Sequence, residues 1–259
     1  WDDPFFTTSG VRSDLDIFLV DPSTGKSVGT GGTDNNIQMQ TPTETVTYTA
    51  GGSATALDVM IRVSSGQNPG RIKYVNYGRN SSSAITFNEF GSSNTPTVIP
   101  HAAASQAMSV AAVPYYDHAT AESFTSYGPS TILFATDGTR LSSPDVRQTP
   151  KISAVDGTNT TFFQSDAGPD SDSLPNFFGT SAAAPHAAAV GALVLQANPS
   201  FTPAQLYNQL ISTAVDIGTS GYDNITGYGR VDAWRAVHGS IVPYSTILPD
   251  LNFTEGFEN

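Results

Sequence analysis

Hydrophobic and polar residues alternate in two short stretches of the N-terminal half of the chain. Leu15, Ile17 and Leu19 take every second position of residues 14–19, and residues 57–63 repeat the pattern. A period of two residues is typical of a half-buried β-strand. Both stretches are therefore predicted to be strands.

The rest of residues 1–97 has the same all-β character. Residues 43–49 and 71–77 are predicted to be further strands, and glycine-rich turns such as 29–32 and 51–52 lie between the strands. No helical pattern is visible in this part of the sequence. Short strands separated by turns predict a small β-sandwich.

Helical patterns begin only in the second half of the chain. Residues 181–197 are rich in alanine, with larger apolar residues at helical spacing. Thr202 followed by Pro203 is a favourable N-cap and first-turn pair, and it predicts a helix that continues to about residue 214. A third short helix is predicted over 231–237. The polar, proline-bearing stretch at 241–259 is typical of a linker or tail.

Composition and charge narrow the possible partners. The 259 residues include 11 basic and 23 acidic ones, which gives a net charge of −12. This balance argues against nucleic acid and anionic membranes, because both bind cationic surfaces. There is no cysteine, so disulfides and thiolate chemistry are excluded. No apolar run reaches the roughly 20 residues that span a bilayer. Because the sequence opens without a signal peptide, its start is expected to be internal to a longer protein.

The most informative string in the sequence is FFGTSAAAPHAAAVGA, residues 177–192. It places Ser181 in the first turn of the predicted helix, directly after the sharp turn that Gly179 permits. The free amides and the positive dipole end of a helix N-terminus stabilise a developing oxyanion. A serine that only caps the helix is the alternative, but capping does not account for the small residues, Pro185 and His186 that follow.

This string resembles the serine motif of the subtilase family, Gly-Thr-Ser-x-Ala-x-Pro-His followed by small residues. Three more segments, at 122–129, 151–157 and 227–233, are similar to family segments and occur in the family's order. The resemblance covers residues 98–240. It implies that this region is the C-terminal part of an α/β subtilisin-like catalytic domain, with a doubly wound parallel sheet.

The same resemblance implies roles for the residues of the motif. Ser181 is expected to be the nucleophile that forms an acyl-enzyme, and its backbone amide one oxyanion donor. Gly179, Thr180 and Phe178 are expected to contact the substrate, Thr180 beside the oxyanion hole and Phe178 on the leaving-group side. His186 is expected to be structural, because five residues along a helix it points away from Ser181.

Other parts of the family's catalytic machinery are missing from the sequence. The family's aspartate stands in Asp-Ser/Thr-Gly, its histidine in His-Gly-Thr, and its oxyanion asparagine at the end of Ala-Ala-Gly-Asn; none of these motifs occurs here. Asp156-Gly-Thr is not the aspartate motif, because Asp156 belongs to another family segment, at a position where proline is usual. The sequence therefore predicts the serine-bearing part of a peptidase, inactive alone, whose partner is the upstream half of the same enzyme.

The β-rich residues 1–97 resemble a β-sandwich that some bacterial subtilases insert into the catalytic domain. The alternative for the whole chain is a non-catalytic binding module or pseudopeptidase that displays this sandwich. Asp14 and Asp16 lie on the same face of a strand, so they are candidate ligands for a structural calcium ion; solvated acids on an outer face are the other interpretation. No cofactor is required by the chemistry. The expected substrate is protein or peptide, and the expected location is extracellular.

Overall fold

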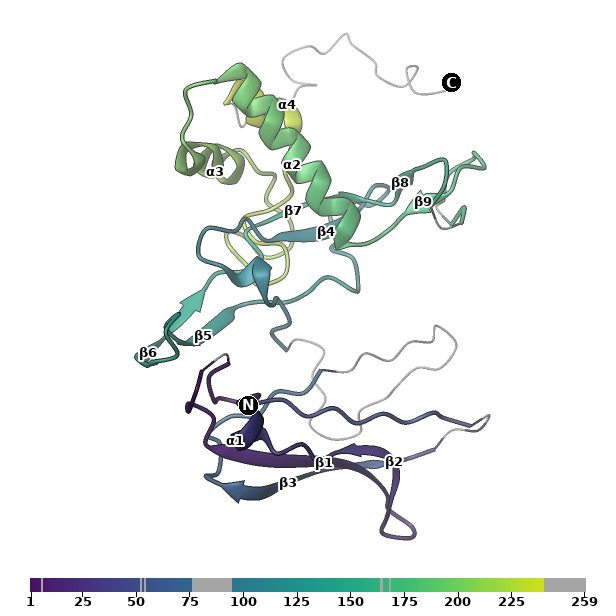
Figure 1. The fold of residues 1–259 in the computed structure, drawn as a ribbon. Helices are drawn as coiled ribbons and strands as arrows, with labels where there is room; N and C mark the ends of the chain where they lie inside the picture. The colour runs from purple at the N-terminus through teal and green to yellow at the C-terminus, as the bar shows by residue number, and fades with distance from the viewer. Residues whose placement is uncertain are drawn as a thin grey trace. The chain divides into compact units, whose positions relative to one another are not determined.

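The computed structural model describes residues 1–5, 7–51, 53, 55–75, 95–163, 165–167 and 169–239 (Figure 1). The chain divides into two compact units. The first contains Trp1–Glu89 and Ile132–Asp145, and the second contains Phe90–Thr131 and Val146–Asn259. The predicted tail at 241–259 lies outside the described residues, and so does the end of the predicted strand at 71–77.

The first unit is built on a three-stranded antiparallel sheet. Its strands are β1 (Ser13–Asp21), β2 (Lys26–Gly32) and β3 (Asp58–Gly66), in the order β2-β1-β3. Strands β1 and β3 confirm the two strands predicted from alternation. Figure 1 shows β1 between the other two.

The alternation on β1 does not separate an apolar face from a polar one as the sequence suggested. A β-bulge lies between Asp14 and Leu15, and Asp14, Leu15 and Asp16 are all buried. A bulge adds a residue to one strand and re-aims the neighbouring side chains. The interpretation of Asp14 and Asp16 as solvated acids is therefore wrong.

Other expectations for this region also need correction. Residues 43–49 contribute only an isolated bridge, from Thr47 to Thr30, and the described residues 71–75 form no strand. A short helix, α1 (Asn36–Met39), forms where no helix was expected, because Asn35 caps it by accepting a hydrogen bond from the amide of Gln38. The described strands of residues 1–97 form one sheet, β2-β1-β3, and the β-sandwich stays a prediction.

A second small sheet is formed by β5 (Ser130–Phe134) and β6 (Arg140–Arg147). Within the first unit, the guanidinium of Arg140 donates to the carboxylate of Asp2 at 2.7 Å and lies 5.3 Å from the centre of the Phe134 ring. These contacts hold the turn between β5 and β6 against the N-terminal segment.

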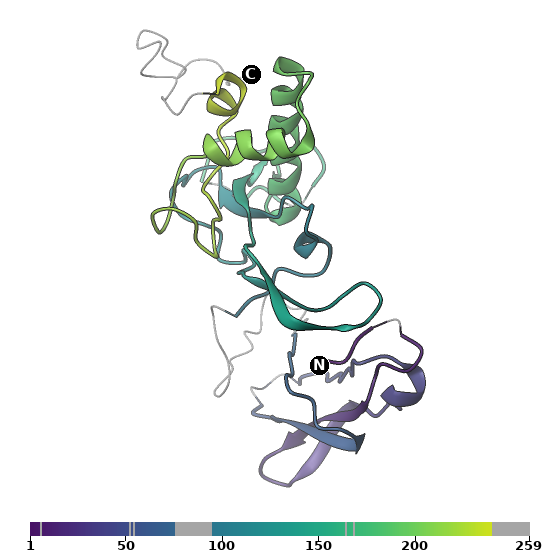
Figure 2. The same ribbon diagram turned by 90° about the vertical axis from the view of Figure 1, so that its left-hand side faces the viewer.

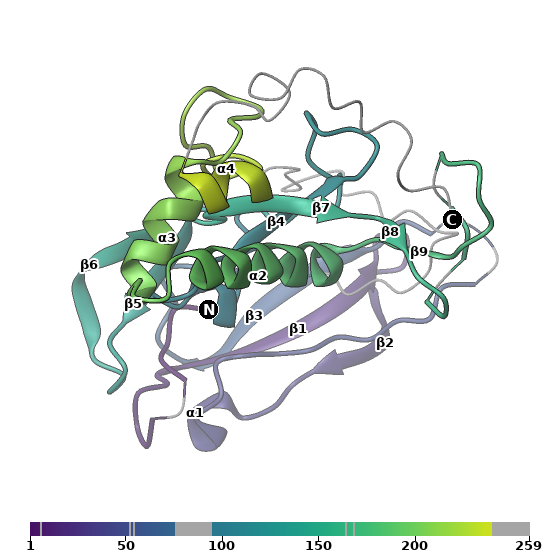
Figure 3. The same cartoon turned by 90° about the horizontal axis from the view of Figure 1, so that it is seen from above.

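The second unit contains the parallel strand pair that an α/β domain requires. Strand β4 (Val110–Pro114) runs parallel to β7 (Ile152–Asp156), and helix α2 (Thr180–Ala197) packs on both strands (Figure 3). Small side chains let the helix approach the strands closely. The core between them contains Ala112, Ile152, Ala154, Ala183, Ala187 and Val194.

Two further helices pack against α2 (Figure 2). Helix α3 (Pro203–Ser212) starts with a capping box, in which Thr202 and Gln205 satisfy each other's amides. Helix α4 (Ala233–His238) is capped by Asp232, which accepts from the amide of Arg235. All three helices predicted from the sequence are confirmed, with ends that differ by one or two residues.

Candidate active site

The serine motif begins in the segment between β7 and α2 and continues into the helix. After Asp156, the short strands β8 (Thr158–Asn159) and β9 (Asn176–Phe177) pair antiparallel, and the chain enters α2 through Gly179. Gly179 has a φ of 132°, a conformation that side-chain-bearing residues rarely adopt. Glycine is therefore needed at the entry to the helix.

Ser181 is the second residue of α2, and its side chain is exposed. The amides of Ala182 and Ala183 both donate to the carbonyl of Gly179, at 2.8 and 3.1 Å. By contrast, neither the amide nor the hydroxyl of Ser181 has a hydrogen-bond partner in the described part of the chain. The serine thus presents an unused N–H donor and a free hydroxyl at the positive end of an 18-residue helix.

Aromatic side chains flank this turn. The Phe178 ring lies edge-on to Tyr116 with centroids 6.5 Å apart, and the rings of Phe163 and Phe177 lie 4.2 Å apart. Phe162 beside them is 82% exposed. Gly179, Thr180 and Phe178, the residues expected to contact the substrate, are all half-buried around Ser181.

Asn176 holds the loop that carries these aromatic residues. Its buried amide nitrogen donates to the Gly157 carbonyl and to Oδ1 of Asn159, both at 3.0 Å, and its Oδ1 accepts from the amide of Ala167 at 2.9 Å. The Tyr115 hydroxyl donates to Asp170 at 2.5 Å in the same loop. Burial, together with this carboxylate, raises the pKa of Tyr115 to about 12.

Behind the turn lies an acid, Asp156, for which the sequence predicted no role. The carboxylate of Asp156 is buried, and its Oδ2 accepts a hydrogen bond from the amide of Gly179 at 2.7 Å. Glu122 is its neighbour. Burial raises the pKa of both carboxyl groups, and the charge of Asp156 raises that of Glu122 further. The sequence signal was the acid at the end of a buried strand, where the family usually has proline.

No histidine contacts the serine hydroxyl among the described residues. The Nδ1–H of His186 donates to the Val155 carbonyl at 2.9 Å, so its ring faces β7. His238 stacks on Trp234 with centroids 3.6 Å apart, and His101 and His118 are exposed. Among the described residues, the Ser181 hydroxyl thus has no hydrogen bond to a histidine.

The side chains suggested for calcium are engaged in protein contacts. Asp14 accepts from the amide of Asn36 at 3.0 Å and from the Ser65 hydroxyl at 3.1 Å, and Asp16 pairs with Arg62. Both oxygens of Asp14 and Oδ2 of Asp16 thus already have partners within the protein, and the calcium role of the two residues stays a prediction. In the part of the chain that is described, no group of three or more His, Cys, Asp or Glu residues is arranged to hold a metal.

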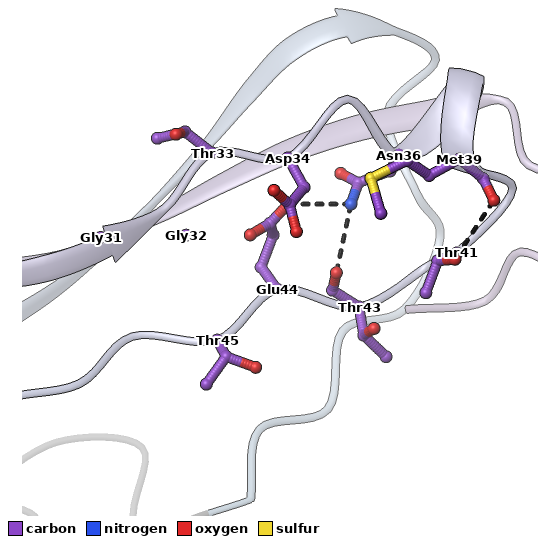
Figure 4. Close-up of a pocket in the computed structure, with 10 residues that line it drawn as sticks. All are labelled: Gly31, Gly32, Thr33, Asp34, Asn36, Met39, Thr41, Thr43, Glu44 and Thr45. Carbon is purple, nitrogen blue, oxygen red and sulfur yellow. Dashed lines mark hydrogen bonds between the residues drawn. The ribbon is translucent and has the colours of Figure 1, made fainter.

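A polar pocket of the first unit lies beside this strand (Figure 4). It is lined by residues 31–34, Asn36, Met39, Thr41 and 43–45, and the carboxylates of Asp34 and Glu44 face the same space. Burial is the main cause that raises the pKa of Glu44, and the negative charge of Asp34 adds to it. The side chain of Asn36 donates to Glu44 at 2.8 Å and to the Thr43 carbonyl at 3.1 Å. Asn36 thus holds Thr43 and Glu44 in place on one side of the pocket.

Comparison with known proteins defines the class of protein. A family model described as the subtilase family, Peptidase S8, matches residues 23–229. The chain therefore belongs to the subtilase family.

None of the helices among the described residues is long and apolar enough to cross a membrane.

Individual relatives match shorter parts of the chain. An extracellular serine protease of Serratia marcescens is 41% identical over 64 residues, 25% of this chain and 6% of the relative. The halolysin-like extracellular serine protease Nep of Natrialba magadii is 48% identical over 66 residues, 26% of this chain and 12% of the relative. The structure of fervidolysin from Fervidobacterium pennivorans, described as a keratinolytic enzyme related to subtilisin, is 25% identical, covers 58% of this chain and 20% of that chain, and has a TM-score of 0.35. The matched segments are a small part of each relative, and the family assignment rests on the family model.

Proposed function

We propose that this chain is the serine-bearing part of a secreted subtilisin-type endopeptidase, with Ser181 as the nucleophile. The observation that carries the proposal is the position of Ser181. It is exposed in the first turn of α2, after a glycine with positive φ, and its own amide is unpartnered among the described residues. The names of the relatives, extracellular serine proteases, support secretion.

The chemistry follows from this position. Ser181 Oγ attacks the scissile carbonyl of a peptide, its proton passes to a base, and the Ser181 amide stabilises the oxyanion. The protonated base gives its proton to the departing amine, which leaves on the side of Phe178 and the neighbouring aromatic rings. Water then hydrolyses the acyl-enzyme. The histidine base, its aspartate and the oxyanion asparagine come from outside this chain.

The exposed face of α2 supports the proposal that a second polypeptide segment, which contains the histidine, the aspartate and the asparagine, packs on this chain. Leu193 is 47% exposed and Leu195 37% exposed, and Ala184, Ala188 and Ala189 are exposed with them. A helix that is apolar on all sides is normally buried. The upstream half of the same enzyme is the partner we expect on this face, with residues 98–240 completing its catalytic domain, residues 1–97 an inserted β-sandwich and 241–259 a tail.

A second candidate function is a non-catalytic binding module. The observation in its favour is that the Ser181 hydroxyl has no base among the described residues. A serine without a base is hardly nucleophilic at neutral pH. The two candidates differ in whether a segment with a histidine base assembles with this chain.

Covalent labelling separates them. Intact mass is measured before and after reaction with a fluorophosphonate, for the purified chain and for the chain co-expressed with the upstream half. We expect labelling of Ser181 only when the upstream half is present, and no labelling of Ser181→Ala. Ser123→Ala, an exposed serine outside the motif, is the matched control and should label normally. Absence of labelling in the complete assembly would favour the binding module.

A further inference from the structure

Asp156 and Glu122 are neighbouring carboxyl groups behind the turn that leads into α2. Asp156 ends β7 with no exposed surface, and Oδ2 of its carboxylate accepts from the Gly179 amide at 2.7 Å. Gly179 precedes Ser181 by two positions, and its carbonyl accepts from the amides of Ala182 and Ala183 in the first turn of α2. The carboxylate therefore holds Gly179, the N-cap residue from which the helix begins.

The other oxygen of this carboxylate is not satisfied in the same way. Oδ1 of Asp156 is buried and has no hydrogen-bond partner in the described part of the chain. A buried carboxylate oxygen without a donor is costly. The neighbouring group able to fill it is the carboxyl of Glu122, whose protonated form is a donor and whose ionised form is a second negative charge.

We propose that Asp156 is a positioning residue for Ser181, and that Glu122 supplies the proton shared by the two carboxyl groups. In this arrangement the pair carries one negative charge. That charge binds the Gly179 amide, and the shared proton fills Oδ1 of Asp156. The inference rests on the proposed function only in taking Ser181 as the reacting group.

The pair makes the turn sensitive to pH. The titratable groups that face Asp156 among the described residues are Glu122, from the loop after β4, and His186, from α2. Two adjacent carboxylates do not both ionise without a large cost. When the shared proton is lost, the repulsion between Asp156 and Glu122 is relieved by moving the turn, and the Ser181 amide and hydroxyl lose their alignment.

Kinetics of Ser181 labelling by a fluorophosphonate, measured against pH in the complete enzyme, test this role. A histidine base alone gives a rate that rises with pH and then levels off. We expect the wild-type rate to fall again at higher pH, where the pair loses its proton. Glu122→Gln, whose amide is a permanent donor to Asp156, should keep the maximal rate within about 3-fold and abolish the fall.

Asp156→Ala should slow labelling by about 10- to 100-fold, the usual effect of a misplaced reacting group. Its matched control is Asp137→Ala, because Asp137 also accepts one backbone amide, that of Thr139 at 2.8 Å, but lies in the first unit. The control should label at the wild-type rate. Asp156→Asn keeps an acceptor for the Gly179 amide and serves if the alanine variant does not fold; it should label without an alkaline fall.

A second readout is independent of activity. Amide hydrogen exchange at Gly179 should be faster in Asp156→Ala than in Asp137→Ala by about 10-fold or more, because the 2.7 Å hydrogen bond is lost. Equal labelling and equal exchange in these two variants would overturn the positioning role. An alkaline fall that persists in Glu122→Gln would overturn the shared proton. If wild-type enzyme is not labelled at any pH, the proposed function fails, and the exchange measurement alone decides whether Asp156 holds the turn.

Discussion

The ring of Phe178 lies against the backbone of Gly157. A Cβ atom at residue 157 would be 2.4 Å from Cε1 of that ring, and φ of Gly157 is +75°. The glycine thus serves both the turn after β7 and the aromatic side chain beside Ser181.

Replacement of this glycine should have two separate effects. Gly157→Ala should lower the free energy of unfolding by about 1–2 kcal/mol, the usual cost of a side chain in the left-handed region, and should displace Phe178. Gly25→Ala is the control, because Gly25 has φ +66° and no atom within 4 Å of a Cβ. Urea denaturation should give similar losses for both variants, while only Gly157→Ala slows the labelling of Ser181. Equal labelling rates would show that the Phe178 ring has no role in the reaction.

Asn36 should be among the most sensitive positions of the first unit. Its Oδ1 accepts from the Leu15 amide at 2.9 Å, and it has no exposed surface. Asn36→Ala leaves that amide and the Thr43 carbonyl without partners, so we expect a loss of about 2–4 kcal/mol in urea denaturation. The neighbouring exposed residue provides the control: Gln38→Ala should change stability by less than about 0.5 kcal/mol. A loss below 1 kcal/mol for Asn36→Ala would contradict the network around Asn36.

Stability should depend on pH through Glu122 and Asp156. Their carboxyl groups have pKa values raised by burial, so the folded chain keeps protons that the unfolded chain has released. Stability is then greatest below the unfolded pKa of about 4 and is lost as the pH rises through the folded values. Urea denaturation between pH 4.5 and 8 should show a smaller decline for Glu122→Gln than for wild type. Parallel curves for the two proteins would contradict this coupling.

The first turn of α3 offers a local test of the fold. Thr202 and Gln205 form a capping box, and Thr202→Ala should cost about 1 kcal/mol. Ser200→Ala, at an exposed position just before it, should have little effect. The measurement is the midpoint of thermal unfolding, and a Thr202→Ala midpoint equal to that of Ser200→Ala would show that the cap is dispensable.

The features that the sequence predicted correctly are determined by residues close to one another along the chain. Strands β1 and β3 follow from alternation, and α3 follows from the Thr202-Pro203 pair, because each signal is contained in the element itself. The position of Ser181 at a helix start was predictable for the same reason. The four residues of α1 are too few to show a helical period, so this helix was missed.

What the sequence could not reveal depends on partners far along the chain. Hydrogen bonds from Asn36 and Ser65 stabilise the buried Asp14, and an ion pair with Arg62 stabilises the buried Asp16. Before folding, nothing near these acids distinguishes them from solvated ones. The role of Asp156 was hidden for the same reason. Its contacts come from Gly179, 23 residues away, and from Glu122 in the loop after β4.

The parallel pairing of β4 with β7 has a consequence for the order of folding. Contacts between distant segments form more slowly than local ones, because the intervening chain must first be closed into a loop. Helix α2 forms from local contacts, yet the bond that fixes its first turn needs β7 in place. We therefore expect a newly made or partly unfolded chain to contain the serine without the organised turn, and the turn to form only when the long-range contacts between β4 and β7 close.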